Sequence, residues 1–282
     1  RFGVTPGKQV AVFTNNDDGW RTASDLVEKG VNVTAVIDTR SKTAPTAIAG
    51  AEIIMGEEII DTAGRKGLRS LTLKSGKVIK ADCLAVSGGW NPNVHLTCHQ
   101  RGKPEWNSDV LAFVPGGTLP TGMKIAGAAN GTLGLFSGMK SAVQEAQKIV
   151  QELGQKPACY DIPSSEDEPQ NGAAIWHVED SKKRAWVDLQ NDVTVKDIQL
   201  SHQEGFRSVE HLKRYTTLGM GTDQGKTSNI AGLAIIAECS GKTIQEMGTT
   251  IFRPPYTPIP IGALAGRARG KDFRPYRLTP SH

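Results

Sequence analysis

The 282-residue sequence has little of what marks a secreted, membrane-bound or nucleic-acid-binding protein. No apolar run approaches the roughly 20 residues that a membrane span needs. Basic and acidic residues, 33 against 29, are spread along the chain, so no charged block points to nucleic acid. The few cysteines form no CxxC pair and have no histidine at ligand spacing, which argues against a zinc site and a disulfide framework: Cys83, Cys98, Cys159 and Cys239. We therefore expect a soluble cytoplasmic protein with free thiols, no metal, and neither a membrane nor a nucleic-acid partner.

The chain also lacks the features typical of the two ends of a domain. Residue 1 is Arg, and "FGVTPGKQVAVF" follows it directly, a pattern typical of the middle of a domain. The last residues, "RPYRLTPSH", follow without a terminal helix or strand. We therefore expect a fragment of a longer polypeptide.

The first part of the chain has a β-turn-α-β pattern. Residues 9–14 are apolar and β-branched, as in a buried strand, and residues 20–30 place apolar side chains at helical spacing and end on a glycine. Residues 31–38 repeat the strand pattern and end in Asp38. In such a half-domain a dinucleotide sits at the first turn.

That first turn, "TNNDDGW", argues against a bound dinucleotide. The turn needs glycines so that the backbone can approach the pyrophosphate, and here it has one. Asp17 and Asp18 would repel a diphosphate, and Trp20 would occupy its space. We favour a turn that folds without binding, over the alternative in which Asp38 binds a ribose.

A later segment resembles the flavoprotein disulfide reductases. "LRSLTLK" and "KVIKADCLAVSGG" alternate apolar and polar residues around "SG", which predicts a hairpin. "ADCLAVSGGWNPNVHL" then matches that family's strand, its Ala/Ser-x-Gly turn and its Arg-x-Pro-Asn motif, with Trp90 in place of the arginine. The resemblance implies an α/β fold with a partial dinucleotide-binding domain over residues 1–155.

A second marker of that family follows in "MKIAGAANG", which predicts a strand leading into an amphipathic helix. In the family an aspartate after the glycine holds the flavin. Here Gly127 is kept and Ala128 replaces the aspartate, so that NAD in place of FAD is conceivable. The glycine-rich turn 127–138 either lines a ligand or permits tight packing of the helix.

The rest of the chain predicts a linker and a small, mainly helical module. Residues 156–183 are rich in proline, serine and acidic side chains and have no periodicity, as expected of a linker. Residues 184–282 carry helical patterns that begin after Thr194, after Ser208 and after the pair Thr227 and Ser228, and then "TIQEMGTT". "FRPPYTPIPIG" predicts an extended arm, stiffened by proline, that lies across a partner surface.

Within this module the loop "LGMGTDQGKTSN" has the composition of an anion site. Backbone N–H groups at a glycine-rich turn that enters a helix, with Thr, Ser and Lys beside them, suit a phosphate. "GKTS" resembles a P-loop, but the glycine spacing is wrong and the preceding residues are helical, so we exclude nucleotide hydrolysis. Composition alone leaves open a capped loop with a solvated cationic face.

Residues 184–282 resemble the alpha subunits of heterotetrameric bacterial sarcosine oxidases, in "WVDLQNDVTVKDIQLSHQEGFRSVEHLKRYTTLGMGTDQGKTSNIAGLAIIAE" and "GTTIFRPPYTPIPIGALAGRARG". The resemblance implies an enzyme that oxidises sarcosine with oxygen to glycine, hydrogen peroxide and formaldehyde or, with tetrahydrofolate, methylenetetrahydrofolate. It implies FAD on a beta subunit, FMN at the alpha–beta interface, NAD on the alpha subunit, and gamma and delta subunits as further partners. The tetrahydrofolate-binding domain and an amino-terminal part with a GxGxxG turn would lie outside these residues.

The same resemblance implies that the module forms the alpha side of the FMN site, with no catalytic residue and no activity in isolation. Asn191 and Thr194 would lie near the isoalloxazine ring. The phosphate and ribityl chain would be surrounded by Lys213, Arg214, Thr216, Thr217, Gly219, Gln224, Lys226, Thr227 and Ser228.

Two other hypotheses belong to different classes. The altered first turn and Ala128 favour a non-catalytic scaffold or docking module with a nucleotide fold, as part of a multi-subunit amine or opine oxidase. A self-sufficient NAD(P)H-dependent flavoprotein reductase is disfavoured, because GxGxxG and CxxC are both missing.

Overall fold

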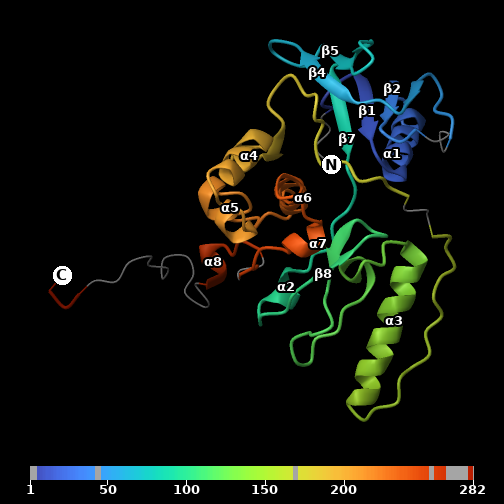
Figure 1. Ribbon diagram of the computed structural model, residues 1–282. Helices are drawn as coiled ribbons and strands as arrows, with labels where there is room; N and C mark the ends of the chain where they lie inside the picture. The colour runs from blue at the N-terminus through green and yellow to red at the C-terminus, as the bar shows by residue number, and fades with distance from the viewer. Residues whose placement is uncertain (1–4, 42–45, 168–170, 254–256, 265–278, 282) are drawn as a thin grey trace.

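The computed structural model describes residues 5–41, 46–167, 171–253, 257–264 and 279–281, and its first part is built on a parallel sheet (Figure 1). The strand order is β3, β2, β1, β7, with bounds Glu52–Met55, Asn32–Asp38, Gln9–Thr14 and Cys83–Ser87. Helix α1, Asp17–Glu28, connects β1 to its parallel neighbour β2. The predicted β-turn-α-β unit is confirmed.

Successive residues of β1 serve two separate cores, because adjacent side chains of a strand point to opposite faces of the sheet. Val10 and Val12 pack with Trp20 of α1. Ala11 faces an antiparallel meander together with Leu71. The meander consists of β4, β5 and β6, at Ile59–Ala63, Ser70–Leu73 and Val78–Lys80. The parallel sheet is thus covered by α1 on one face and by the meander on the other.

The hairpin predicted from the alternating segments is confirmed by β5 and β6. Its second segment, however, is divided between two sheets, since β6 belongs to the meander and β7 pairs with β1. The division falls at Asp82, whose Oδ1 accepts the backbone N–H groups of Lys8 (2.8 Å) and Gln9 (2.7 Å). Asp82 therefore fixes the start of β7 beside the start of β1.

The region after β7 contains short elements: α2 (His95–Cys98), β8 (Glu105–Asn107), β9 (Ala112–Val114) and the 3-10 helix η1 (Gly127–Asn130). The strand predicted from "MKIAGAANG" is wrong. Gly127 and Gly131 have φ of 64° and 78°, which interrupts an extended chain and allows η1 to form there. Helix α3, Leu135–Glu152, is confirmed; none of its residues is buried, and Figure 1 shows it at the edge of the described structure.

The second part is mainly helical, with α4 (Val195–Gln203), α5 (Val209–Thr216), α6 (Asn229–Cys239), α7 (Ile244–Met247) and α8 (Ile261–Leu264), and the short hairpin β10 (Trp186–Asp188) and β11 (Val193–Thr194). Leu233 of the apolar helix α6 belongs to one core cluster with Ile198 of α4 and Leu212 of α5. Phe113 of β9 lies in the same cluster. The β8–β9 hairpin thus packs against the helical module that follows it in sequence.

The helix starts follow the sequence prediction with one exception. Thr194 caps α4 in a reciprocal capping box with Asp197, and the Ser208 hydroxyl accepts the His211 N–H (3.2 Å) at the start of α5. Ser228, rather than Thr227, stands at the start of α6, and its hydroxyl makes no capping bond.

The predicted C-terminal arm is described only in part. Residues 254–256 and 265–278 lie outside the described residues, and the short helix α8 lies between them. Among the residues that are described, no helix combines the length and the apolar character required to cross a membrane.

Candidate functional site

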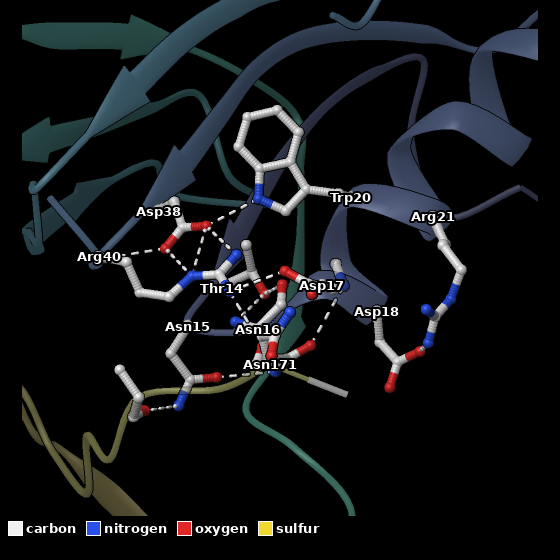
Figure 2. A network of polar contacts seen from close by, with 12 residues as sticks. Thr14, Asn15, Asn16, Asp17, Asp18, Trp20, Arg21, Asp38, Arg40 and Asn171 are labelled. Carbon is white, nitrogen blue, oxygen red and sulfur yellow. Dashed lines mark hydrogen bonds and ion pairs between the residues drawn. The ribbon is translucent and has the colours of Figure 1, made fainter. Parts of the chain in front are cut away.

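A buried polar network closes the turn after β1 (Figure 2). Asp38 is fully buried; its Oδ2 accepts Trp20 Nε1 and Arg40 Nη2, both at 2.7 Å, and its Oδ1 accepts the Arg40 backbone N–H at 2.8 Å. The hydrogen bond to Asp38, assisted by Asp17, raises the pKa of the Arg40 guanidinium despite burial. Both oxygens of the carboxylate that could have bound a ribose are therefore occupied by protein donors.

The two acidic residues at the start of α1 are also paired within the chain. Arg40 Nη1 lies 2.7 Å from Asp17 Oδ1. Asp18 forms an ion pair with Arg21 and accepts the indole N–H of Trp90, the residue that replaces the family's arginine. The sequence predicted repulsion of a diphosphate here. It did not reveal Arg40 as the partner, because that residue follows β2 and is far from the turn in sequence.

A second polar centre organises the loop between α5 and α6. Asp188, 1% exposed, accepts the backbone N–H groups of Gln190 (2.9 Å), Asn191 (3.1 Å) and Gly219 (2.9 Å). It also accepts Asn191 Nδ2 (3.0 Å) and the Ser228 hydroxyl (3.4 Å). Burial opposes its ionisation, but the bonds from Gly219 and Asn191 outweigh burial, so the pKa of Asp188 lies below its ordinary value.

The backbone donors of this loop are largely used by the loop itself. The Gly225 N–H donates to Asp223 Oδ1 (3.0 Å), and the Ser228 and Asn229 N–H groups donate to the Gly225 carbonyl (3.2 and 2.9 Å). Together with the Gly219 N–H on Asp188, these bonds occupy four of the amides on which the anion hypothesis relied. Side chains would therefore have to supply part of the recognition of an anion at this loop.

The predicted FMN residues fall into three classes of exposure. Three are exposed: Arg214, Thr217 and Thr227; five are half-buried: Asn191, Lys213, Thr216, Gln224 and Lys226; and three are buried: Thr194, Gly219 and Ser228. Asp188 links Asn191, Gly219 and Ser228. The Thr194 and Thr216 hydroxyls serve helix ends, bonding to Asp197 (2.6 Å) and to the Leu212 carbonyl (2.8 Å). Gly127 belongs to η1, which packs with α3, away from this loop.

A cluster of cations lies at the C-terminal end of α5. Burial and the nearby charges of Arg253 and Arg214 lower the pKa of Lys213, although Glu210 acts in the opposite direction. Glu210 accepts Arg214 Nη1 and the Ile251 N–H, both at 2.8 Å. The Gln224 side chain bonds both the N–H (3.0 Å) and the carbonyl of Arg253. Lys213 thus lies near two other cations and the Glu210 carboxylate, and the start of the C-terminal arm is held against the loop.

His95 and Phe252 lie beside the loop and were missed by the sequence reasoning. Their rings stack with centroids 4.0 Å apart, and they line a cavity of about 10 Å³ together with Asn229. Desolvation by burial lowers the pKa of His95. The cavity has room for about one water molecule, far less than a flavin ring needs. No signal in "NPNVHL" placed His95 here, because α2 and the arm meet only in the fold.

The parallel sheet, its crossover helix and the antiparallel meander define an α/β fold of the dinucleotide-binding type. The crystal structure of L-proline dehydrogenase from P. horikoshii shares this fold: it aligns with a TM-score of 0.68 over 94% of this chain and 51% of that chain, at 17% identity.

The sequence comparisons find relatives among the alpha subunits of sarcosine oxidases. The chain is 40% identical to the sarcosine oxidase subunit alpha of Rhizobium meliloti (strain 1021) and 36% identical to that of Corynebacterium sp. (strain P-1), in both cases over 100% of its length. It spans 29% and 31% of those relatives. Residues 182–267 match the family described as the sarcosine oxidase A3 domain. Over its whole length the chain is thus similar to part of the sarcosine oxidase alpha subunits.

Proposed function

We propose that this chain provides a nucleotide-fold scaffold and the alpha side of an FMN site in a sarcosine oxidase. The relatives are named as alpha subunits of that enzyme, which supports an oxidoreductase subunit. The proposed division is a dinucleotide-binding-like domain over residues 1–155, a linker over residues 156–183, and the A3-type module with its arm over residues 184–282.

The observation that carries the proposal is the cation cluster beside the rigid loop. Lys213 feels the charges of two other cations, Arg214 and Arg253, and of the carboxylate of Glu210, and burial disfavours the charged form of Lys213. A phosphate with nearly two negative charges would stabilise these cations through charge-assisted hydrogen bonds. The exposed hydroxyls of Thr217 and Thr227 would supply further donors at the loop surface.

The predicted site residues divide into two roles in this proposal. Lys213, Arg214, Lys226, Thr217 and Thr227 would contact the phosphate and ribityl chain. The others would position them: Asn191, Gly219 and Ser228 through Asp188, Thr194 and Thr216 at helix ends, and Gln224 by holding Arg253.

The isoalloxazine ring finds no cavity of its size around His95 and Phe252, so it would lie between this chain and a beta subunit. FMN, when bound, would supply the one- and two-electron chemistry that passes electrons from the FAD of the beta subunit to oxygen. This chain would hold the phosphate and one face of the ring, and it would have no activity alone.

The remaining parts of the proposal follow the family. The whole enzyme would oxidise sarcosine to glycine with hydrogen peroxide and formaldehyde or methylenetetrahydrofolate, with tetrahydrofolate bound outside these residues. Beta, gamma and delta subunits would be its partners in the cytoplasm. NAD would bind the alpha subunit through the turn at Gly127, where φ is 64° and the space that a Cβ would take is open.

The proposal is tested by co-expression with a beta-type subunit and measurement of the FMN released from the purified complex. The double substitution Arg214→Ala with Lys226→Ala should weaken FMN binding about tenfold or more, because it removes two cations from the phosphate site. The control pair Lys196→Ala with Arg207→Ala removes two exposed cations of the same module and should leave binding unchanged. Undiminished FMN in the first pair would refute the phosphate assignment, and a flavin-free wild-type interface would refute the proposal itself.

The scaffold hypothesis is favoured for one region by a specific observation. The turn after β1 has its carboxylates and its arginine paired with each other, so residues 5–41 contribute structure rather than a ligand site.

A further inference from the structure

The crevice where a nucleotide would bind the parallel sheet is located by the strand order. In open α/β sheets, ligands bind beyond the carboxyl ends of the strands, at the point where the order reverses. Here that point lies between β1 and β7, which are neighbours although α1 and the strands β2 to β6 come between them in sequence. Asn16 bridges it: its Nδ2 donates to the Ser87 carbonyl (3.0 Å), and the Ser87 hydroxyl donates to its Oδ1 (3.1 Å).

Part of the linker lies in this crevice. The carbonyl oxygen of Asn171 accepts the backbone N–H of Asp17 (3.1 Å), the first residue of α1, and also Arg40 Nη1 (2.9 Å). Figure 2 shows Asn171 beside Asp17 at the start of the helix. An N-terminal helix amide and an arginine are the donors that a pyrophosphate oxygen would use. The Asn171 carbonyl takes both.

The neighbouring residues extend the contact into a short antiparallel pairing. Gly172 forms a β-bridge with Asn16. The Ala173 N–H donates to the Asn15 carbonyl (2.9 Å), and Asn15 Nδ2 donates to the Ala173 carbonyl (2.7 Å). Asn15, with 4% of its surface exposed, is a buried residue of the turn.

The linker touches the same half-domain a second time, on the meander. The Lys182 N–H donates to the Ile60 carbonyl (2.9 Å) of β4, and the Lys183 ammonium pairs with Asp61 (3.0 Å). Asp180 pairs with Lys74 (2.8 Å). The linker therefore lies along the half-domain before it enters the helical module at β10.

We propose that Asn171–Ala173 is the resident occupant of the nucleotide crevice, and that the crevice serves to dock the linker and hold the helical module. A dinucleotide is not bound at this turn. The turn, which has one glycine, then serves to bind the linker, because Asn15, Asn16 and Asp17 supply the side chains and backbone amides that hydrogen-bond a peptide segment. Arg40 joins the buried Asp38 to the docked segment. This inference is independent of the FMN site and of any NAD at Gly127.

The first test is amide hydrogen exchange of the 282-residue chain, followed peptide by peptide with and without millimolar NAD. The amides of Asp17 and Ala173 should be protected, and NAD should leave exchange in residues 14–20, 38–40 and 171–173 unchanged. New protection of the turn by NAD, or release of residues 171–173, would overturn the proposal. An NAD effect confined to the turn at Gly127 would leave it standing, since that turn is a separate site.

The second test breaks one bond of the dock without altering the turn. Ala173→Pro removes the N–H that donates to Asn15, and Ala174→Pro makes the same replacement at the next, exposed residue. We expect Ala173→Pro to raise the rate of limited proteolysis within residues 156–183 about five- to tenfold over Ala174→Pro, because loss of one hydrogen bond raises the population of the opened linker. Equal cleavage rates, with the same far-ultraviolet circular dichroism for both variants, would show that residues 171–173 are not held in the crevice.

Discussion

Replacement of Asp188 by asparagine tests whether one buried carboxylate organises the loop between α5 and α6. The substitution keeps the size of the side chain and removes its charge. Oδ1 of Asp188 accepts two backbone N–H groups, and Oδ2 accepts the Gly219 N–H, Asn191 Nδ2 and the Ser228 hydroxyl. Whichever way the new amide is oriented, its NH₂ group faces at least two donors.

The expected cost follows from these contacts. A buried donor left without an acceptor costs roughly 1–3 kcal/mol, and such costs are not additive within one network. The Ser228 hydroxyl can rotate to become an acceptor, which reduces the penalty. We therefore expect Asp188→Asn to lower the free energy of unfolding by about 3 kcal/mol, at the high end for a single isosteric substitution.

Chemical denaturation followed by tryptophan fluorescence measures this loss. Asp192→Asn is the matched control, because it removes a carboxylate from an exposed residue of the same turn, and asparagine tolerates its φ of 55°. If Asp188→Asn unfolded at the same denaturant concentration as Asp192→Asn and the wild type, with the same slope, the organising role of Asp188 would be refuted.

The dependence of stability on acid pH should also report on Asp188. The folded pKa of Asp188 is lowered, so its stabilisation is complete above the unfolded value, near 3.9, and is lost as the pH falls through the lower folded value. Asp188→Asn should therefore lose less stability than the wild type between about pH 4 and pH 2. Parallel acid curves for the two proteins would contradict the ionised state assigned to this carboxyl.

Two further predictions concern the surroundings of the loop. Gly225→Ala should destabilise the protein by about 2–4 kcal/mol, because the φ of Gly225 is 71° and a Cβ would lie 2.2 Å from Asn229 Oδ1. The control Gly241→Ala, with a φ of 61° and open space around the position, should cost about 1 kcal/mol. Equal melting temperatures for the two variants would refute a steric clash at Gly225. Burial lowers the pKa of His95 in the folded protein. The unfolded state therefore binds a proton first as the pH drops below about 6.5, the ordinary histidine value, and the free energy of unfolding should fall until the lower folded pKa is reached. His95→Phe should flatten the curve in that window, and an unchanged slope would refute the buried neutral state.

Much of the fold could be predicted because it depends on short-range patterns. The apolar, β-branched run in residues 9–14 predicted the buried strand β1, which lies between two cores, and the caps at Thr194 and Ser208 predicted the starts of α4 and α5. The predicted strand over residues 123–131 failed for a local reason as well, since two glycines with positive φ interrupt it. Glycine permits such a turn without requiring it, so composition could not decide between the two structures.

The contacts that define the two polar centres could not be predicted in the same way. Arg40 and Asn171 are separated by 131 residues and meet at one carbonyl oxygen. Asp188 was not singled out by the sequence, yet it is buried and accepts the N–H of Gly219, a residue that the resemblance placed around a phosphate. In both cases a group of the chain itself occupies the donors that a motif would assign to a ligand. That information lies only in the tertiary structure.

The two polar centres differ in which polar groups remain to bind a ligand once the chain's own contacts are made. At the turn after β1, the linker and Asp38 use the helix amide, the indole and the arginine together, so the intrachain contacts satisfy the crevice. At the loop after α5, Asp188 and Asp223 accept backbone N–H groups, while Lys213 lies near Arg214, Arg253 and Glu210, and Thr217 and Thr227 are exposed. Under the proposed function an anion would complement the cations around Lys213, whereas the donors of the crevice already have partners within the chain. In this proposal a dinucleotide-type fold keeps its sheet, places its own linker in one nucleotide crevice, and would hold FMN on the module that follows the linker.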